Sequence, residues 1–505
     1  MSNESKKFSR RDFLKTATAV SAGVAGAVTF SGCSSAPSDA SLPNKWDEEA
    51  DVLVIGSGFA GLSAALKAHD GGAKVKILEK MPMAGGNSTI NGGAVSAVNS
   101  PLQQEQGIED TVELMYQDML KAGLYFNHSE LARMVAENCN EAVQWTINEL
   151  GVEYTDTLVQ FGGHSVARSY ATKVGTGFGI IKQMLAKVEE LGIDLTLEAK
   201  VVKLYKDESG RVVGLMVENA FSGETLNIKA NKAVVLGSGG FSQDVTFRQI
   251  QDPRLDENID CTNHSGATAE VMQEALKIDA MPVQLAYIQL GPWASPDEKG
   301  FGLVPWFSVP AGSPWGIIVD PVNGKRFVNE LTDRKRKADA ILEVGHPTIN
   351  ICDSFGWGKV PPSWDLSPAV EKGIIFKADT IEEIAEHYDI PVEALVETVE
   401  TYNQYVVDGV DSDFDKPIPP IAEPMVTAPF YAARLWPKVH HCMGGLRINT
   451  DAQVIDIDGN PIPGLYAAGE ITGGIHGATR LGSASTADCI VFGRIAGINA
   501  AQESV

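Results

Sequence analysis

Three glycines near residue 60 have the spacing that a dinucleotide-binding turn requires. Gly56, Gly58 and Gly61 form the pattern G-x-G-x-x-G. In this pattern one glycine makes a tight turn, the second lets the backbone approach a pyrophosphate, and the third lets helix and strand pack closely. The acidic residue Glu79, farther along the chain, can accept hydrogen bonds from ribose hydroxyls. This stretch therefore predicts phosphate and ribose binding.

The segments around these residues read as a strand–turn–helix–strand unit. Val52–Ile55 is an apolar run typical of a buried strand, small and apolar residues from Leu62 to Ala68 suit a helix, and Lys74–Leu78 reads as the next strand. The helix N-terminus would face the phosphates with unpaired N–H groups and the positive end of its dipole. Because all of these parts are present, the pattern favours dinucleotide binding over a plain βαβ turn.

Length and charge narrow the class of protein. A chain of 505 residues can form two or three domains with ample buried core. The formal net charge of −24 argues against nucleic acid as a partner, and equally against an anionic membrane surface.

The N-terminal segment reads as an export signal followed by a tether. Ser9–Lys15 contains a twin-arginine pattern, and a run of small apolar residues follows from Ala17 to Phe30. Cys33 then stands in a lipoprotein-like cleavage box, and residues 34–49 suit a linker. We therefore expect a signal over 1–33, export by the twin-arginine route and an extracytoplasmic protein, lipid-anchored through Cys33. A non-lipidated export signal is the alternative.

The other cysteines are scattered, and no C-x-x-C or C-x-x-C-H pattern occurs. The sequence accordingly predicts no haem attachment, no iron–sulfur cluster and no metal site in this chain.

Farther along, the residue composition of the sequence changes twice. Helices are expected at 111–123 and 129–151, strands at 195–205 and 212–219, and a second buried strand at 233–236 runs into glycines. From about residue 260 tryptophans and prolines cluster. After residue 464 the sequence again has the small apolar residues and glycines typical of the nucleotide-binding sheet. The cofactor-binding domain is therefore expected to be split in sequence, with another domain inserted.

Several longer motifs, taken together and in order, resemble one family. They are GSGFAGLSAA, GGNS at 85–88, NHSGAT at 263–268, GKRFVNE at 324–330, HHCMGG at 440–445 and GLYAAGEITGGIHGATRLG at 464–482. These stretches resemble the flavoprotein of flavocytochrome c-type fumarate reductases and their urocanate-reducing relatives, over roughly residues 50–505.

The resemblance implies an α/β fold: a Rossmann-like FAD-binding domain at 50–258 and 442–505, with an inserted, mobile α+β capping domain at 259–441. It implies non-covalent FAD, with the adenine half on the first glycine turn and the flavin half near the later motifs. The implied cofactor-binding residues are Gly56, Gly58, Phe59, Ala60, Gly61, Glu79, Lys80, Gly86, Asn87, Ser88, Gly93, Val201, Gly237, Gly469, Glu470, Gly482, Ser483 and Ser485.

The resemblance also implies a carboxylate-binding set. His264, His441 and Arg480 match residues that hold the substrate carboxylate in the relatives, whereas His440 is expected on the flavin side or in a structural role. An arginine fork pairs with a carboxylate through two hydrogen bonds, and imidazoles add donors. The same donors would stabilise an enolate-like transition state.

One departure from the family concerns the proton donor. In fumarate reductases an arginine shortly before GKRFVNE delivers the proton, and counting back places Ser313 there. A serine hydroxyl is a very poor acid near pH 7. Tyr287 is the nearest candidate by order, and Arg168 and Tyr170 come from another segment.

Four aromatic residues surround this departure: Trp293, Trp306, Phe307 and Trp315. They form either the core of the capping domain or the wall of a broad apolar pocket. The second interpretation suggests an aryl or bulky α,β-unsaturated acid or an enone.

The sequence thus favours an exported FAD-dependent reductase of a polarised C=C bond, used in anaerobic respiration with a separate cytochrome, flavoprotein or quinol donor. A ketosteroid dehydrogenase-like enzyme and a non-catalytic electron relay are the alternatives.

Overall fold

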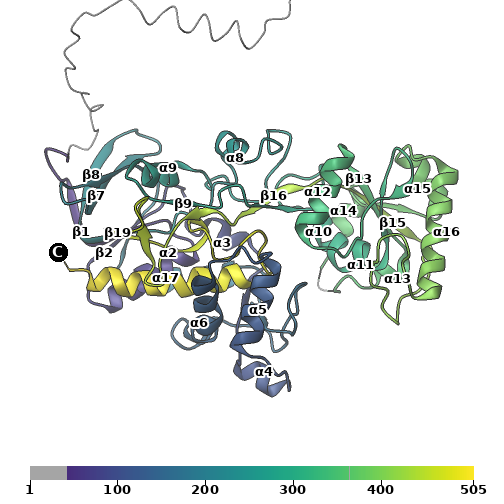
Figure 1. Ribbon diagram of the computed structural model, residues 1–505, viewed down its shortest axis with the longest axis horizontal. Helices are drawn as coiled ribbons and strands as arrows, with labels where there is room; N and C mark the ends of the chain where they lie inside the picture. The colour runs from purple at the N-terminus through teal and green to yellow at the C-terminus, as the bar shows by residue number, and fades with distance from the viewer. Residues whose placement is uncertain (1–41, 363, 505) are drawn as a thin grey trace, which may run out of the picture. The chain divides into compact units, whose positions relative to one another are not determined.

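The structure is a computed structural model that describes residues 42–362 and 364–504 (Figure 1). The predicted signal and the lipidation site at Cys33 lie outside the described residues. The predicted linker through residue 49 ends earlier than expected, because Trp46 packs edge-on against Tyr205 with ring centroids 5.5 Å apart. Strand β1 (Glu48–Ile55) then pairs with β8 from its first residue.

The main sheet has eight strands and is drawn from both ends of the described chain. Its order is β18-β19-β8-β1-β2-β5, with β7 attached to β8 and β6 to β7. The apolar run in β1 is buried because it pairs in parallel on both sides, with β2 and β8. The other strands are β2 (Val75–Leu78), β5 (Asp194–Thr196), β6 (Ala199–Lys206), β7 (Val212–Asn219), β8 (Thr225–Leu236), β18 (Gln453–Ile455) and β19 (Pro461–Ala467).

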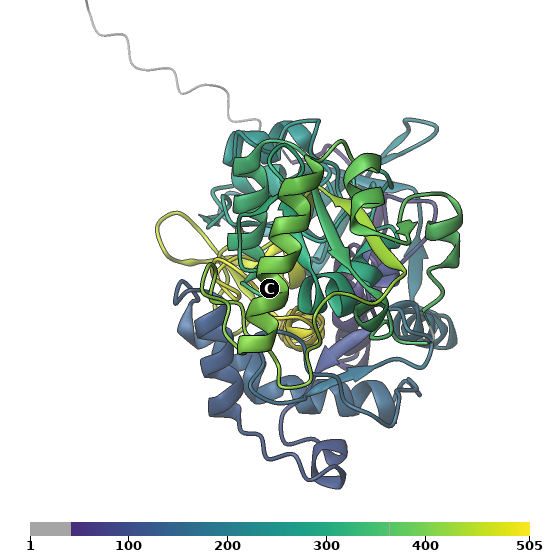
Figure 2. The same ribbon diagram turned by 90° about the vertical axis from the view of Figure 1, so that its right-hand side faces the viewer.

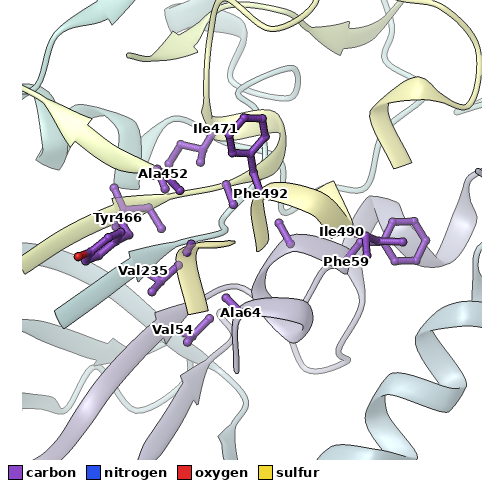
Figure 3. Close-up of a cluster of buried hydrophobic side chains, with 14 of the residues drawn as sticks. Val54, Phe59, Ala64, Val235, Ala452, Tyr466, Ile471, Ile490 and Phe492 are labelled. Atoms are coloured by element: carbon purple, nitrogen blue, oxygen red, sulfur yellow. The ribbon is translucent and has the colours of Figure 1, made fainter. Parts of the chain in front are cut away.

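Two helices from opposite ends of the chain, α2 (Phe59–Asp70) and α17 (Ala484–Gln502), pack closely together next to this sheet (Figure 1). A side chain at Gly493 or Gly497 would place its Cβ only 2.5 or 2.2 Å from a backbone oxygen of α2. Figure 3 shows the resulting core, in which Val54 and Val235 of the sheet lie near Ala64 of α2 and Phe492 of α17.

The remaining helices of this part match most of the sequence-based expectations. Thr111 accepts a hydrogen bond from the Leu114 N–H and so caps α5 (Val112–Ala122), and α6 (Ser129–Asn148) follows. The expected strand at 195–205 is wrong as a single element, because Glu198 has a φ of 61° and separates β5 from β6. The other elements are α3 (Gly86–Ile90), α4 (Pro101–Glu105), α7 (Phe178–Glu190), α8 (Val245–Gln251), α9 (Glu270–Lys277), β3 (Ala94–Ser96) and β4 (Ser169–Ala171).

A second, antiparallel sheet forms the inserted α+β region. Its order is β12-β11-β13-β15-β14, built from β11 (Ile317–Asp320), β12 (Lys325–Arg326), β13 (Thr348–Cys352), β14 (Phe376–Ala378) and β15 (Phe430–Leu435). The long helix α16 (Val392–Asp408), seen in front in Figure 2, contributes Leu395 and Val399 to a core with Ile317 and Ile349. The other helices include α10 (Val304–Phe307), α12 (Arg334–Val344), α13 (Ser354–Trp357), α14 (Ser367–Glu371) and α15 (Ile381–His387).

Two short antiparallel ladders lie where the chain enters and leaves the inserted region. Strand β9 (Pro282–Val283) pairs with β17 (Gly445–Leu446), and β10 (Ile288–Gly291) pairs with β16 (Lys438–Cys442). The ladder between β10 and β16 is irregular, since Gln289 lies opposite His441 whereas Leu290 lies opposite Val439. His440 is therefore an extra residue on β16, as in a β-bulge.

No helix among residues 42–362 and 364–504 is long and apolar enough to cross a membrane.

Candidate active site

A large cavity lies over the carboxyl ends of β1 and β2, beside the predicted glycine turn. It encloses about 910 Å³, including the part that opens to solvent. Most of the predicted cofactor residues line it: Gly56, Gly58, Phe59, Ala60, Glu79, Lys80, Gly86, Asn87, Ser88, Val201, Gly237 and Glu470. The cavity thus lies at the edge of a parallel sheet where ligands of doubly wound folds bind.

The glycine turn has the close contacts that its spacing predicted. Gly56 has a φ of +96°, and a Cβ there would lie 2.4 Å from the Gly237 oxygen. A Cβ on Gly61 would lie 2.0 Å from the Gly56 oxygen, so this glycine serves helix packing. Glu79 Oε2 accepts from the Ser57 N–H at 3.1 Å and from the Ser57 hydroxyl at 2.6 Å, which fixes the carboxylate at the cavity wall.

The same wall suits a dinucleotide such as FAD. Helix α2 begins after Gly58 with neither a side-chain cap nor an acidic residue in its first turn, so its N-terminus can receive phosphates. Gly86 and Gly239 have no atom within 4 Å of a built Cβ, which leaves open space along the backbone. The donors, the glycines and the size of the cavity therefore fit the cofactor.

Six predicted cofactor residues do not line this cavity: Gly61, Gly93, Gly469, Gly482, Ser483 and Ser485. Ser483 precedes α17 and has a φ of 63°. Its hydroxyl is hydrogen-bonded to the hydroxyls of Ser96 and Ser169, at 2.6 Å each. The flavin contacts expected from these residues stay predictions.

The bulge in β16 directs two consecutive histidines to different partners. Arg480 Nη2 lies 3.2 Å from His440 Nε2, and with arginine as the donor the His440 Nδ1–H donates to Thr262 Oγ1 at 2.8 Å. His441 Nδ1 instead lies 3.4 Å from Glu470 Oε1 on the cofactor cavity. The bulge thus places His440 beside Arg480, although the sequence led us to expect His441 there, and the predicted substrate-binding role of His441 stays a prediction.

Arg480 is held in a desolvated environment, and among the described residues no carboxylate lies within ion-pair distance of it, although Glu470 acts on it from farther away. Burial, followed by the charge of Arg334, lowers the pKa of Arg480 to about 9. Its Nε is buried and has no hydrogen-bond partner in the part of the chain that the structure describes. A buried, unused donor of this kind is costly and indicates a missing acceptor.

Arg334, the first residue of α12, is the site residue that the sequence reasoning missed. Its Nη1 donates to Gln289 Oε1 at 3.3 Å, and the Gln289 amide contacts the Arg480 carbonyl oxygen at 3.5 Å. The family's arginine is expected before GKRFVNE, whereas Arg334 follows that motif by four residues. A signal was present: four basic residues, 334–337, begin this helix, where positive charge is unfavourable.

Arg480, Arg334 and His440 are called the unpaired cluster below. Over residues 42–362 and 364–504, no carboxylate lies within ion-pair distance of either guanidinium. Burial and the charge of Arg480 lower the pKa of His440 well below its usual value, so the imidazole is neutral. The cluster therefore presents two positive charges and a neutral imidazole.

The other predicted catalytic residues lie elsewhere. His264 lines the cofactor cavity, where its backbone N–H donates to Asn87 Oδ1 at 2.6 Å. Tyr287 packs on Phe126, with ring centroids 5.6 Å apart. Ser313 is buried in the inserted region and accepts from Lys337 Nζ at 3.4 Å.

The four aromatic residues were expected either in the core of the inserted region or in the wall of an apolar pocket, and they do not all lie in the same place. Phe307 is fully buried in the core of the inserted region, and Trp315 packs edge-on against Phe355. Trp306 packs against Phe301 and Trp364. Only Trp293 reaches the unpaired cluster, through His440 at a ring-centroid distance of 5.1 Å.

A second buried arginine, Arg168, has a different environment. It is fully buried, and its guanidinium contacts Asp110 at 2.9 Å and Asp118 at 2.6 Å. Although burial opposes ionisation of Asp118, hydrogen bonds from Ser165 and Arg168 lower the pKa of this carboxyl. Arg168, Asp110 and Asp118 are called the paired cluster below, and their contacts argue for a structural role.

Comparison with known proteins agrees with this fold and this cavity. The sequence matches the family described as FAD binding domain over residues 51–486, and the chain belongs to this family. It is 43% identical to the acrylate reductase flavoprotein subunit of Shewanella woodyi, over 96% of this chain and 97% of that one. It is 37% identical to the urocanate reductase of Eggerthella lenta, over 91% and 76%.

Among solved structures, the open conformation of a flavocytochrome c3 fumarate reductase is similar, with a TM-score of 0.77 and 33% identity. The match covers 99% of this chain and 82% of that one. The protein is thus an FAD-binding oxidoreductase of the fumarate reductase-like group, with the inserted α+β region of that fold.

Proposed function

We propose that this protein is an FAD-dependent reductase of the C=C bond of an α,β-unsaturated carboxylate. The observation that carries the proposal is the unpaired cluster, whose guanidinium groups have no carboxylate within ion-pair distance among the residues that the structure describes. The cluster adjoins the cofactor cavity through Glu470, which lines the cavity and interacts electrostatically with Arg480. A substrate carboxylate placed there would satisfy the buried donors of Arg480.

When bound, FAD supplies the hydride, in its two-electron reduced form. Arg480 and His440 bind the carboxylate and draw electron density toward it, which makes the β-carbon electrophilic. Because these donors are already oriented, they also stabilise the enolate-like charge that develops in the transition state.

Arg334 is proposed to donate the proton to the α-carbon, in place of the serine and tyrosine expected from the sequence. Burial lowers its pKa, which makes the guanidinium a better acid than usual. Gln289 orients it through the 3.3 Å hydrogen bond to Nη1. The α-carbon receives this proton as the hydride reaches the β-carbon, and solvent must then reprotonate the arginine.

Electrons are proposed to come from a separate cytochrome, flavoprotein or quinol system outside the cytoplasm, as part of anaerobic respiration. The relative from Shewanella woodyi is itself described as a flavoprotein subunit, which supports a separate donor. The twin-arginine pattern in Ser9–Lys15 supports export, and Cys33 is the proposed lipid anchor. The boundaries of the capping domain at 259–441 and non-covalent binding of FAD belong to the same proposal.

The alternatives receive less support from the site. An aryl or bulky acid was expected from four aromatic residues, of which only Trp293 contacts the unpaired cluster. A ketosteroid substrate carries no carboxylate for Arg480 and Arg334. A pure electron relay has no use for a buried Arg480 Nε without a partner.

The test is an anaerobic assay of the full chain loaded with FAD. We expect reduced viologen to be oxidised when unsaturated carboxylates are added, with the saturated acid as product. If no such acid reoxidises the flavin, while a 3-oxosteroid reduces the oxidised protein, the reductase assignment is wrong and the dehydrogenase alternative holds. Flavin reoxidation by neither class would favour the relay.

A further inference from the structure

Three large apolar side chains lie exposed where α3 packs against the start of α7. Ile90 ends α3, Val174 lies in the loop before α7 and Phe178 begins α7; they are 53%, 62% and 46% exposed. Thr172 Oγ1 donates to the Thr176 oxygen at 2.7 Å, which closes the loop that carries Val174. Single exposed apolar residues are common, but a group of them on one surface marks an interaction site. Ile90, Val174 and Phe178 are called the α3–α7 patch below.

Close backbone contacts hold the two helices of this patch together. The Gly177 N–H donates to the Asn91 carbonyl oxygen at 2.9 Å. A Cβ on Gly177 would lie only 1.9 Å from the Ser88 oxygen, so α7 begins directly against α3. Ile90 and Phe178 are the chain neighbours of Asn91 and Gly177. A fixed backbone therefore presents these two side chains on one surface.

The opposite side of α3 faces the cofactor cavity. Gly86, Asn87 and Ser88 of α3 line this cavity. Burial raises the pKa of Glu470, and a hydrogen bond from Asn87 opposes this shift, so Asn87 lies beside the carboxylate that adjoins Arg480. The thickness of one helix, about 10 Å, thus separates the α3–α7 patch from the part of the cavity nearest the unpaired cluster.

The segments that build the patch contain no carboxylate, although the chain has 65 acidic residues. Asp and Glu are absent from residues 80–104 and from residues 157–188. Lys182, one turn after the start of α7, takes part in no ion pair within residues 42–362 and 364–504. Lys173 is 55% exposed, and its Nζ lies 3.8 Å from Glu153. A partner surface with carboxylates around an apolar centre would complement this region.

We propose that the electron donor docks on the α3–α7 patch, and that this donor is a redox protein whose contact face has an apolar centre edged by carboxylates. The inference rests on the proposed function, which needs two electrons per turnover, and it locates their entry. Two electrons pass from the docked donor to bound FAD together with one proton from water, and they leave as the hydride to the unsaturated acid. The patch is small, as in transient redox encounters, whose interfaces are among the smallest between proteins.

The first experiment measures reduction of the FAD-loaded full chain by a protein donor, with no unsaturated acid present. Reduced flavodoxin, a small acidic flavoprotein, is the donor, and anaerobic stopped-flow absorbance follows electron transfer. We expect Phe178→Ser to lower the second-order rate constant about tenfold, because a central apolar contact is lost. Phe221→Ser is the matched control: Phe221 is 75% exposed in the turn between β7 and β8 and does not line the cofactor cavity, so its loss should leave the rate unchanged.

The second experiment reverses one charge at the patch. Lys182→Glu is compared with Lys372→Glu, an exposed lysine after α14 in the inserted region, because both substitutions change the net charge equally. At low ionic strength Lys182→Glu should lower the rate constant with flavodoxin about tenfold, whereas Lys372→Glu should have little effect. The difference between the two variants should shrink as salt is added, because ions screen exposed charges.

Reduced methyl viologen gives the reference rate, because a small molecule needs no docking surface. It should reduce all four variants as fast as wild type, which also shows that they are folded and hold FAD. Equal rate constants with flavodoxin in patch and control variants, or no reduction of wild type by flavodoxin, would overturn the inference. A wild-type dimer that Phe178→Ser dissociates would assign the patch to a second copy of the chain and overturn it as well. Unsaturated acids added to the viologen-reduced protein test the reductase assignment separately, so either conclusion can fail alone.

Discussion

The paired and the unpaired cluster both bury guanidinium groups, but only in the paired cluster do nearby carboxylates offset the cost of desolvation. In the paired cluster two carboxylates lie 2.9 and 2.6 Å from Arg168. In the unpaired cluster, burial lowers the pKa of both Arg480 and Arg334, and the charge of Arg334 lowers that of Arg480 further. A protein retains such an arrangement when an anion from outside completes it. The difference therefore separates an arginine that holds the fold from arginines that hold a ligand.

The largest effect on stability is expected from Arg168→Met. Removing one partner of a buried ion pair leaves Asp110 and Asp118 buried without their cation, which costs about 3–5 kcal/mol. Urea or thermal unfolding measures this loss. Arg254→Met is the matched control, because Arg254 is 52% exposed in its pairs with Asp252 and Asp339 and should contribute below about 1 kcal/mol. Equal effects of the two substitutions would contradict the structural role of the paired cluster.

Arg480→Met should show the opposite profile. Activity with an unsaturated acid should fall by roughly 10²–10³-fold, because the oriented donor for the developing charge is lost. The melting temperature should stay constant or rise, since a desolvated cation without a counter-ion is removed. Steady-state kinetics, flavin content and thermal unfolding measure the three quantities.

The exposed Arg447 offers the control for this substitution, as Arg447→Met should change neither activity nor stability. Destabilisation of Arg480→Met as severe as that of Arg168→Met would mean that the two clusters do not differ in kind.

Lys337, one turn after Arg334 on α12, gives a pH-dependent prediction. Burial lowers the pKa of Lys337 to about 8, although Glu330 opposes the shift. An unfolded lysine titrates near 10.4. Between about pH 8 and 10 the unfolded chain therefore binds more protons, and this residue makes stability rise with pH. Below pH 8 the buried ammonium costs about 3 kcal/mol, from the size of the shift.

Lys337→Met should remove this dependence. We expect the variant to have a higher melting temperature than wild type at pH 7. This gain in stability is reduced by the loss of the 2.7 Å hydrogen bond from Lys337 Nζ to the Glu330 carbonyl oxygen. Unfolding curves from pH 7 to 10 check the slope. A wild-type stability that falls with pH over this range would show that the lysine keeps its proton in the folded protein.

The cofactor side was largely predictable from the sequence, because its signals are local. Gly56, Gly58 and Glu79 lie within one strand–turn–helix–strand unit, where spacing determines geometry. The fold class followed from the same unit together with the family motifs.

The unpaired cluster was less predictable, because its members meet through long-range structure. His440 lies beside Arg480 because of a bulge in β16, which no sequence pattern predicted. Arg334 comes from helix α12, which packs against β10 far from Ser313 in the sequence, so counting along the chain to Ser313 led to a buried hydroxyl instead.

The difference between the two clusters can be tested by adding a carboxylate to the unpaired cluster. Gln289 already accepts from Arg334 Nη1, and its amide nitrogen lies 3.5 Å from the Arg480 carbonyl oxygen, so Gln289→Glu would place a carboxylate on Arg334 and give up the contact with that carbonyl. Hydrogen bonds to a charged group should then stabilise the fold by roughly 1–2 kcal/mol, and the new anion should compete with the substrate carboxylate. We expect a higher melting temperature together with a KM raised about tenfold, measured side by side. Gln289→Met, which removes the hydrogen bond without adding charge, should give no gain in stability. If Gln289→Glu lowers stability and leaves KM unchanged, the two arginines do not act as a binding site for an anion.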